Sequence, residues 1–355
     1  VVEQWYRMNK ATNFDEWNSA MSMTAIPMFN AGYADKTGNI FYIYNAKLPL
    51  RAEGYDWEGV LPGNSSDVVW TEYLPYADLP QVLNPTSGFI QNCNNTPFIT
   101  TTGEDNPDKK NYPDSFGIES HMSNRALRAM ELFGEDPSIS REEFEQYKFD
   151  LRYSDDSYMS QFVDRLISLS YSFEEEKLIQ GVNVLKSWDK NTDYENKNAS
   201  LPIISFGWFM EISPENISDE NLLESFTFAV KYLYNHYGRL DVIWGKINRL
   251  IRGSINLGLG GGPDIPHAVY GIPTEEGYLK GYAGDAFLML VEWEKNGEVS
   301  SKSIHQYGSN TQHESSTHYA DQAKLFVDRK LKPVWLTLQN IIENVEKVYS
   351  PGTNK

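Results

Sequence analysis

Strand-like segments at both ends of the chain flank a long helical block, and this order limits the possible folds more than any other feature. Two aromatic and β-branched runs within residues 29–44 enclose a glycine-containing turn, which predicts a β-hairpin. Within residues 286–304, two further runs flank Asn296-Gly297, a dipeptide typical of hairpin turns. Strands, then helices, then strands again predict an α+β protein with a helical block inserted into a sheet-containing core.

Apolar periodicity and capping signals predict the individual elements. Helices are expected at residues 123–133, 158–169, 177–188 and 222–237, and a further one is expected to open at the capping box Ser140–Glu143. A short strand is expected at 88–91 and a polar loop at 191–198. A C-terminal helix is expected to carry one apolar stripe: Trp335, Leu338, Ile341, Ile342, Val345 and Val348.

These elements divide the chain into three expected regions. Residues 1–120 form a sheet-containing core, residues 121–250 the helical insertion, and residues 251–355 the return to the sheet core with the C-terminal helix.

Composition excludes several classes of partner. The chain has 31 Lys and Arg against 49 Asp and Glu, for a formal net charge of −18. Nucleic acids and anionic membrane surfaces need clustered basic residues, so neither is an expected partner. The Ala286–Val291 run has six apolar residues, whereas a membrane-spanning helix needs ~20. No signal peptide is visible, and because Val1 is not Met, we expect a chain processed or cut from something longer.

The most unusual local sequence is Asn92-Cys93-Asn94-Asn95, followed by Thr96-Pro97. Clustered Asn side chains are typical of a turn in which each amide bonds the neighbouring backbone. The functional alternative is an Asn amide that donates to an oxyanion. Cys93, the only cysteine, excludes an internal disulfide; it is either a small packed side chain or a nucleophile.

Other polar clusters each have a structural alternative. A metal site from His305, His313, His318 and Asp321 matches no compact ligand motif, so a polar loop is favoured. The glycine-rich segment 258–263 lacks the Lys-Ser/Thr of a phosphate loop and is expected to allow close backbone approach. The carboxylate runs at 155–156 and 174–176 are expected to be solvated surface.

Two arginines on the helix at 123–133 remain ambiguous from the residues alone. Arg125 and Arg128 lie three residues apart among apolar positions, where an arginine must have a partner. A structural ion pair and a cation that orients substrate are both consistent with this spacing.

Several short segments occur in an order that resembles one known family. They are ADKTGNI at 34–40, Pro49 and Arg51, NPTSGFIQNCNNTP at 84–97, GGGPD at 260–264, HYADQ at 318–322 and WLT at 335–337. Together they resemble the penicillin amidase family of N-terminal nucleophile hydrolases over nearly the whole chain. The long loop at 51–85 is more similar to the acyl-homoserine lactone and aculeacin acylase branch than to the penicillin G branch.

The resemblance implies part of an αββα fold with antiparallel sheets, and an acylase that cleaves the amide of an N-acyl small molecule. In this family a Ser at the N-terminus of the large chain attacks the acyl carbon, with its own α-amine as base. The second Asn of the Asn-x-Asn pattern, here Asn94, donates to the oxyanion. The family's Arg on the following helix, counted back from Leu132-Phe133, is Arg125 and not Arg128.

The departures from the family pattern define what this chain is expected to lack. No segment before Asn94 looks like the nucleophile start, so the Ser and most of the acyl pocket are expected upstream, in the rest of one precursor. This chain alone is then expected to be inactive. The calcium-binding branch has Asp where Phe116 stands, which argues against calcium, although Asp114 lies two residues earlier. No other cofactor is implied, and a periplasmic or secreted location rests on the resemblance only.

Two alternatives remain open. A non-catalytic member of the same fold would use this scaffold for binding or assembly, because no nucleophile lies in the chain. A cysteine hydrolase would use Cys93 as its nucleophile.

Overall fold

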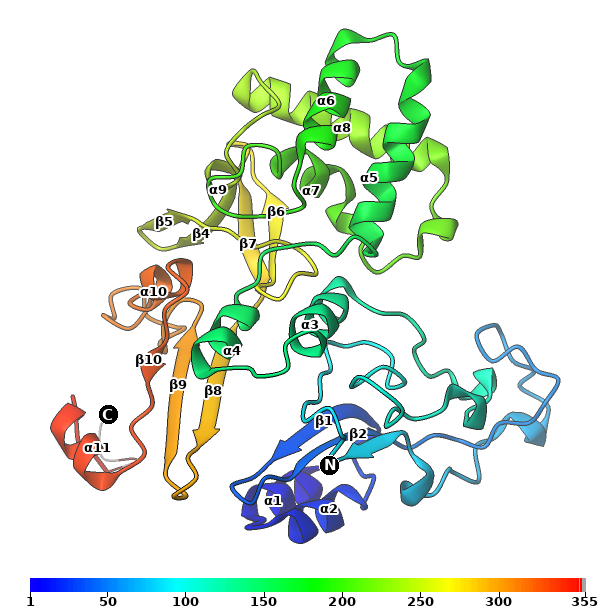
Figure 1. The fold of residues 1–355 in the computed structure, drawn as a ribbon, viewed down its shortest axis with the longest axis vertical. Coiled ribbons are helices and arrows are strands. Elements are labelled where there is room, and N and C mark those ends of the chain that lie inside the picture. Colours follow the sequence, from blue (N-terminus) through cyan, green and yellow to red (C-terminus); the bar gives the residue numbers. More distant parts are fainter. Residues whose placement is uncertain (351, 353–355) are drawn as a thin grey trace. The chain divides into compact units, whose positions relative to one another are not determined.

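The computed structural model describes residues 1–350 and 352, and they form two compact units, Val1–Glu143 and Phe144–Lys355 (Figure 1). None of the helices in this described part combines the length and the apolar character that crossing a membrane requires. Each unit has its own helices and its own sheet structure. The three regions expected from the sequence remain a prediction.

Unit 1 is built on a three-stranded antiparallel sheet in the order β1-β2-β3. Two helices precede it and one follows; the elements are α1 (Val2–Lys10), α2 (Phe14–Met21), β1 (Met28–Ala34), β2 (Ile40–Ala46), β3 (Gln81–Leu83) and α3 (Asn124–Gly134). The central strand β2 is almost wholly buried. Trp17 and Met21 of α2 belong to the same apolar core as Phe41 and Ile43 of β2.

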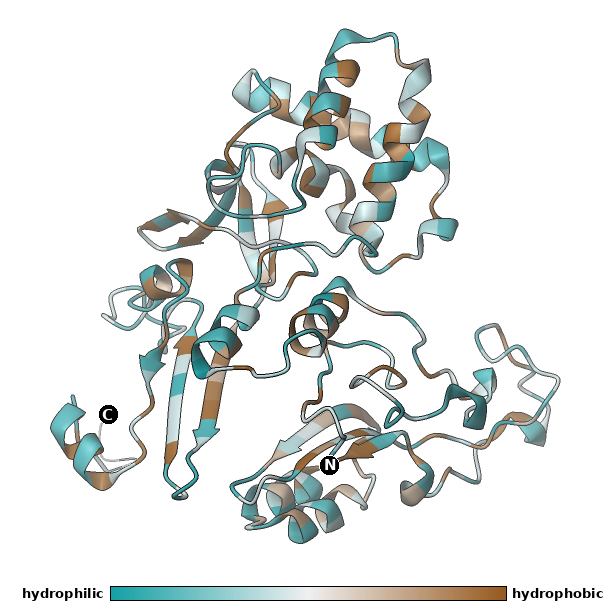
Figure 2. Ribbon diagram, viewed as in Figure 1, coloured by the Kyte–Doolittle hydropathy of each residue, from teal (hydrophilic) through white to brown (hydrophobic). Residues whose placement is uncertain are grey.

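The helices of unit 2 surround an apolar core of their own. They are α5 (Tyr158–Leu169), α6 (Glu176–Ser187), α7 (Ser200–Phe206), α8 (Asp219–Tyr237) and α9 (Trp244–Ile247), while α4 (Arg141–Lys148) contains the boundary between the units. Every residue of α7 is buried. Figure 2 shows apolar residues on the helices α5 to α8, as expected for helices that pack on one another.

Two sheets complete unit 2. One has the strand order β5-β4-β7-β6 and is antiparallel except for the β4–β7 pair; the other is antiparallel in the order β10-β9-β8. The strands are β4 (Asn248–Arg252), β5 (Ile255–Gly258), β6 (Val269–Pro273), β7 (Leu279–Gly284), β8 (Phe287–Trp293), β9 (Val299–His305) and β10 (Lys332–Pro333), with short helices α10 (Ala323–Val327) and α11 (Leu338–Asn344). The expected α+β class with antiparallel sheets is therefore confirmed.

Local sequence signals predicted several of these elements. Both hairpins form, α5 has the predicted bounds, and the capping box closes with Ser140 N and Oγ bonded to Glu143 Oε2 at 2.8 and 2.6 Å. The glycine-rich segment makes the expected close approach. A Cβ at Gly261, which has φ +91°, would lie 2.7 Å from the carbonyl oxygen of His267.

One predicted element is wrong, and another is shorter than predicted. Residues 88–91 form no strand, because Gly88 has φ +78° and the Ser87 hydroxyl accepts from the Phe89 amide 3.3 Å away, so a local turn replaces the ladder. The C-terminal helix is shorter than its apolar stripe. The Val334 N–H donates to Ser301 O at 2.9 Å and so continues the pairing of β10 with β9. The helix starts only after Thr337, which caps it. Trp335, Val345 and Val348 consequently lie outside it.

Candidate active site

The hairpin turn between β1 and β2 is organised by one carboxylate. Asp35 accepts hydrogen bonds from Thr37 N at 2.8 Å, Thr37 Oγ1 at 2.6 Å, Asn39 Nδ2 at 3.1 Å and Tyr33 Oη at 2.9 Å. Partial burial would raise the pKa of Asp35, but these bonds outweigh it and hold that pKa well below its usual range. Asn84 joins this turn to the next segment, since its Oδ1 accepts from Ile40 N at 2.9 Å.

The segment that follows Asn84 leads to a loop held by its own asparagines. Asn92 Oδ1 accepts from Asn94 N at 3.1 Å, and Asn95 Oδ1 accepts from Cys93 N at 2.8 Å. Asn95 is buried, whereas Asn94 is exposed and has φ +59°, a left-handed conformation that Asn adopts more readily than most residues. The Asx-turn prediction is therefore confirmed for the loop, and Asn94 is the member whose side chain points outward.

Helix α3 is attached to this loop at its start and to the segment before the loop at its end. At its start, Ser123 Oγ donates to Cys93 O at 3.1 Å and accepts from Ala126 N at 3.3 Å, so one hydroxyl both caps the helix and holds the loop. At its end, Phe133 stacks on Phe89 with ring centroids 5.9 Å apart. These contacts fix the distance between the loop and the first turn of the helix.

Arg125 lies in that first turn and contacts Asn94. Its Nη1 donates to Asn94 Oδ1 at 3.2 Å, and its side chain is half-buried. A guanidinium can only donate, so the contact assigns the oxygen of the Asn94 amide to Arg125 and turns Nδ2 away from it. Donation from a cation to Oδ1 also polarises the amide, which makes the Nδ2 hydrogens better donors.

The structure thus brings together the two site residues expected from the resemblance, although they are 31 positions apart. An exposed amide donor, backed by a cation and held by a rigid loop, suits stabilisation of a developing oxyanion. Sequence reasoning missed the role of Ser123 in joining the two. A Ser at the start of a helix signals a cap, but nothing in the sequence indicates its second bond.

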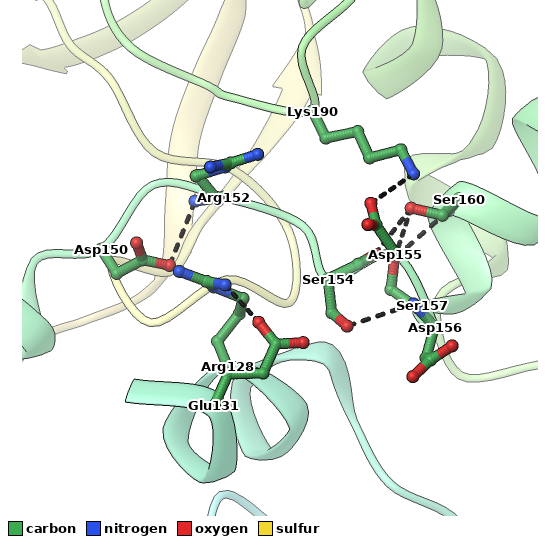
Figure 3. A network of polar contacts seen from close by, with 10 residues as sticks. All are labelled: Arg128, Glu131, Asp150, Arg152, Ser154, Asp155, Asp156, Ser157, Ser160 and Lys190. Atoms are coloured by element: carbon green, nitrogen blue, oxygen red, sulfur yellow. Dashed lines mark hydrogen bonds and ion pairs between the residues drawn. The ribbon is translucent and has the colours of Figure 1, made fainter. Parts of the chain in front are cut away.

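Arg128, the alternative arginine, has a different partner. It forms an ion pair with Glu131 one turn further along α3, and its side chain is only 14% exposed (Figure 3). The same view shows Asp155 paired with Lys190 at 2.7 Å, with the Asp155 side chain 88% exposed. The prediction that this carboxylate belongs to the solvated surface is confirmed.

The histidines considered for a metal site are not gathered. His318 contacts Asp321 through Nδ1 at 2.8 Å and Glu346 through Nε2 at 2.7 Å, while His305 packs on Phe287. Across residues 1–350 and 352, no group of three or more His, Cys, Asp or Glu side chains is placed to hold a metal ion.

The residues do not fit the calcium site of the family's calcium-binding branch. Phe116, at the position of that branch's Asp, is a buried apolar side chain. The carboxylate of Asp114 is 96% exposed and lies 3.8 Å from Lys109 Nζ. Calcium needs six to eight oxygen ligands, and neither residue supplies an inward-facing one.

One buried ionic cluster was not foreseen from the sequence. In unit 2, His267 Nδ1 lies 3.3 Å from Asp285 Oδ2, which is also 2.8 Å from Lys148 Nζ. Burial holds the pKa of His267 below its ordinary value, against the opposing effect of Asp285. Burial acts to raise the pKa of Asp285, but the bond from His267 and the Lys148 charge outweigh it and lower that pKa. Such a cluster is structural unless substrate reaches it.

Curated relatives of this chain are acylases. The chain is 38% identical over 93 residues to penicillin G acylase of Escherichia coli, an alignment that covers 26% of this chain and 11% of that protein. It is 22% identical over 351 residues to the acyl-homoserine lactone acylase PvdQ of Pseudomonas fluorescens, covering 84% and 43%. Penicillin acylase 2 proenzyme of Pseudomonas sp. matches at 28% over 106 residues, covering 30% and 12%. The chain therefore spans less than half the length of these relatives.

A solved structure supports the fold. A thermostable penicillin G acylase from Alcaligenes faecalis superposes with a TM-score of 0.59 at 17% identity, covering 98% of this chain and 72% of that one. The family model described as penicillin amidase matches residues 1–343. The chain belongs to the penicillin amidase family.

Proposed function

We propose that this chain is part of an N-acyl amide hydrolase in which Asn94 Nδ2 stabilises the oxyanion and Arg125 holds and polarises the Asn94 amide. The observation that carries the proposal is the 3.2 Å bond from Arg125 Nη1 to Asn94 Oδ1. This bond turns the Asn94 Nδ2 donor outward, on a loop of a chain that belongs to the penicillin amidase family. The substrate class is an acylated small molecule such as an acyl-homoserine lactone, a penicillin or a lipopeptide.

The nucleophile of this proposal is a Ser outside the chain. Curated relatives are much longer than this chain, which covers 11–43% of their length, and this supports a larger precursor. In the proposed reaction the Ser hydroxyl attacks the acyl carbon while its α-amine takes up the proton. The tetrahedral oxyanion receives the Asn94 hydrogen bond; its collapse breaks the C–N bond, and the leaving amine takes the proton back from the α-ammonium. Water then attacks the acyl-enzyme and releases the acid.

Further features follow from this proposal. Autoproteolysis of the precursor would create the N-terminal Ser, and the upstream part of the same precursor would be the partner of this chain. The chain alone would hydrolyse no amide. A periplasmic or secreted location, with quorum quenching or antibiotic conversion as the biological role, belongs to the same proposal.

The test is expression of the full-length gene product followed by mass spectrometry under denaturing conditions and by an amine-release assay. We expect a large chain that begins with Ser, and release of amine from a phenylacetylated aniline or a long-chain acyl-homoserine lactone. Processing without hydrolysis of any acyl amide would favour the non-catalytic alternative. A full-length product with no Ser at a processing junction would also favour it.

The cysteine hydrolase alternative is tested in the same assay. Cys93 is half-buried, and its backbone is bonded to Asn95 and Ser123. We expect Cys93→Ser to keep the wild-type rate, because its thiol has no role in the proposed reaction. Complete loss of activity in that variant would support the cysteine hydrolase alternative.

A further inference from the structure

One peptide group determines how Asn94 is presented, and both of its ends are held. The group joins Cys93 to Asn94. Its carbonyl accepts from Ser123 Oγ at 3.1 Å, and its N–H donates to Asn92 Oδ1 at 3.1 Å. Rotation of this plane changes ψ of Cys93 and φ of Asn94, and the latter stands at +59°. The two bonds therefore hold the backbone angle that directs the Asn94 side chain.

Ser123 is the one of these two partners that caps α3, the helix that carries Arg125. Its hydroxyl also accepts from Ala126 N at 3.3 Å, so its position is fixed by the first turn of the helix. Two neighbouring contacts, Thr96 N to His121 O at 3.0 Å and Asn95 Nδ2 to Met122 Sδ at 3.5 Å, attach the loop elsewhere. Of these three contacts between the loop and residues 121–123, the Ser123 contact is the one that reaches the Cys93–Asn94 peptide group.

We propose that Ser123 is a positioning residue of the acylase reaction: its hydroxyl locks the Cys93–Asn94 peptide to the helix that bears Arg125, and so aligns the amide donor with the oxyanion. The inference rests on the proposed role of Asn94. Ser123 itself touches no substrate in this account. Its hydroxyl links the two residues of the site.

The decisive variant is Ser123→Gly in the full-length, processed protein. Glycine is an adequate N-cap, so α3 keeps its start while the bond to the Cys93 carbonyl is lost. We expect kcat to fall about tenfold with KM little changed, as for loss of an interaction made in the transition state. Ser123→Thr keeps the hydroxyl and should restore most of the rate.

The matched control is Ser218→Gly. Ser218 caps α8 by accepting from Asn221 N at 3.1 Å and lies far along the chain from the site. This variant should lower thermal stability by as much as Ser123→Gly while leaving kcat at the wild-type value. A wild-type kcat in Ser123→Gly, or an equal loss of kcat in the control, would overturn the proposal.

A double variant separates this inference from the proposed function. If Ser123 acts through Asn94, adding Ser123→Gly to Asn94→Gly should change kcat by less than twofold, because the donor that it aligns is already gone. A further tenfold loss in the double variant would show that Ser123 acts by another route and would reject the inference. Wild-type activity in Asn94→Gly alone would instead reject the role of Asn94.

Discussion

Asn94 has an exposed side-chain amide and a left-handed backbone conformation. A substitution that tests the amide must therefore leave the backbone conformation unstrained. Replacement by Ala removes the donor but also strains a residue at φ +59°. Asn94→Gly removes the donor and tolerates the backbone angle. We expect kcat of the full-length protein to fall ~10²–10³-fold, the usual effect of losing one oxyanion donor.

The control for Asn94→Gly is Lys190→Gly. Lys190 has φ +63° and an ion pair to Asp155, so it tests the same backbone change away from the site. Its kcat should equal that of the wild type. A rate for Asn94→Gly within a factor of two of wild type would remove Asn94 from the mechanism.

In the proposed reaction Arg125 acts through its charge and its bond to Asn94. In Arg125→Gln an amide can still donate to Asn94 Oδ1, but the cation that polarises it is gone. We expect kcat to fall about tenfold, consistent with the larger effect of charged donors. Stopped-flow or steady-state amine release measures it.

Arg128→Gln is the comparison for Arg125→Gln. Arg128 is paired with Glu131 and its side chain is largely buried, so Arg128→Gln should lower the melting temperature because it breaks a partly buried ion pair. It should leave kcat intact. The opposite pattern, with kcat sensitive to Arg128 and not to Arg125, would reverse the assignment of the two arginines.

Among the elements, the β1–β2 hairpin depends on the ionised form of Asp35. The folded state lowers the pKa of Asp35, so its contribution to stability is present above the unfolded-state pKa and is lost as pH falls through the folded-state value. Asp35→Ala should therefore increase amide exchange in β1 and β2 at pH 7. Hydrogen exchange with mass spectrometry measures this change, and unaltered protection of both strands would contradict it.

The segment after α11 contacts His318, whose two ring nitrogens each lie next to a carboxylate. Asp321 and Glu346 only accept, so both ring nitrogens of His318 must carry protons, and the folded state raises the pKa of His318. This contribution is fully present below the unfolded-state pKa of ~6.5 and is lost as pH rises through the higher folded-state value. We expect protection of residues around Glu346 to fall above that value.

The comparison for this pH effect is His318→Gln. The variant cannot become a cation, so its local exchange, corrected for intrinsic rate, should be independent of pH between 6 and 9. A wild-type profile without pH dependence would show that the two contacts do not control this segment.

At the scale of the whole molecule, apolar surface remains exposed on the chain by itself. Along β8, Phe287, Met289 and Val291 are 51%, 46% and 40% exposed, and Leu338 and Ile342 of α11 are 73% and 59% exposed. Exposed apolar patches favour association. We expect the isolated chain to self-associate in analytical ultracentrifugation, and Phe287→Ser with Met289→Ser to reduce this. A monomer at micromolar concentration would contradict the expectation.

How much of this could be foreseen depends on the range of each interaction. Helix α5 and the two hairpins follow from residues within a few positions, so periodicity and turn chemistry predict them. The strand expected at 88–91 does not form, because local hydrogen bonds of a turn take the place of pairing with a neighbouring strand. The proximity of Asn94 and Arg125 depends on the Ser123 hydroxyl reaching Cys93 O across 30 positions. Residue spacing alone left that site open, and only the family resemblance indicated it.

The bonds that hold the Asn94 loop have a consequence for the order of events during biosynthesis. All of those described here join residues between Asn84 and Phe133, apart from the Asn84 link to the β1–β2 turn. None of these contacts needs a residue synthesised after Phe133, and the N-terminal parts of a chain generally fold first during synthesis. We therefore expect the donor to be assembled while the nascent chain is still being completed. On this view, processing of the precursor would supply the nucleophile to an oxyanion-binding site that has already formed.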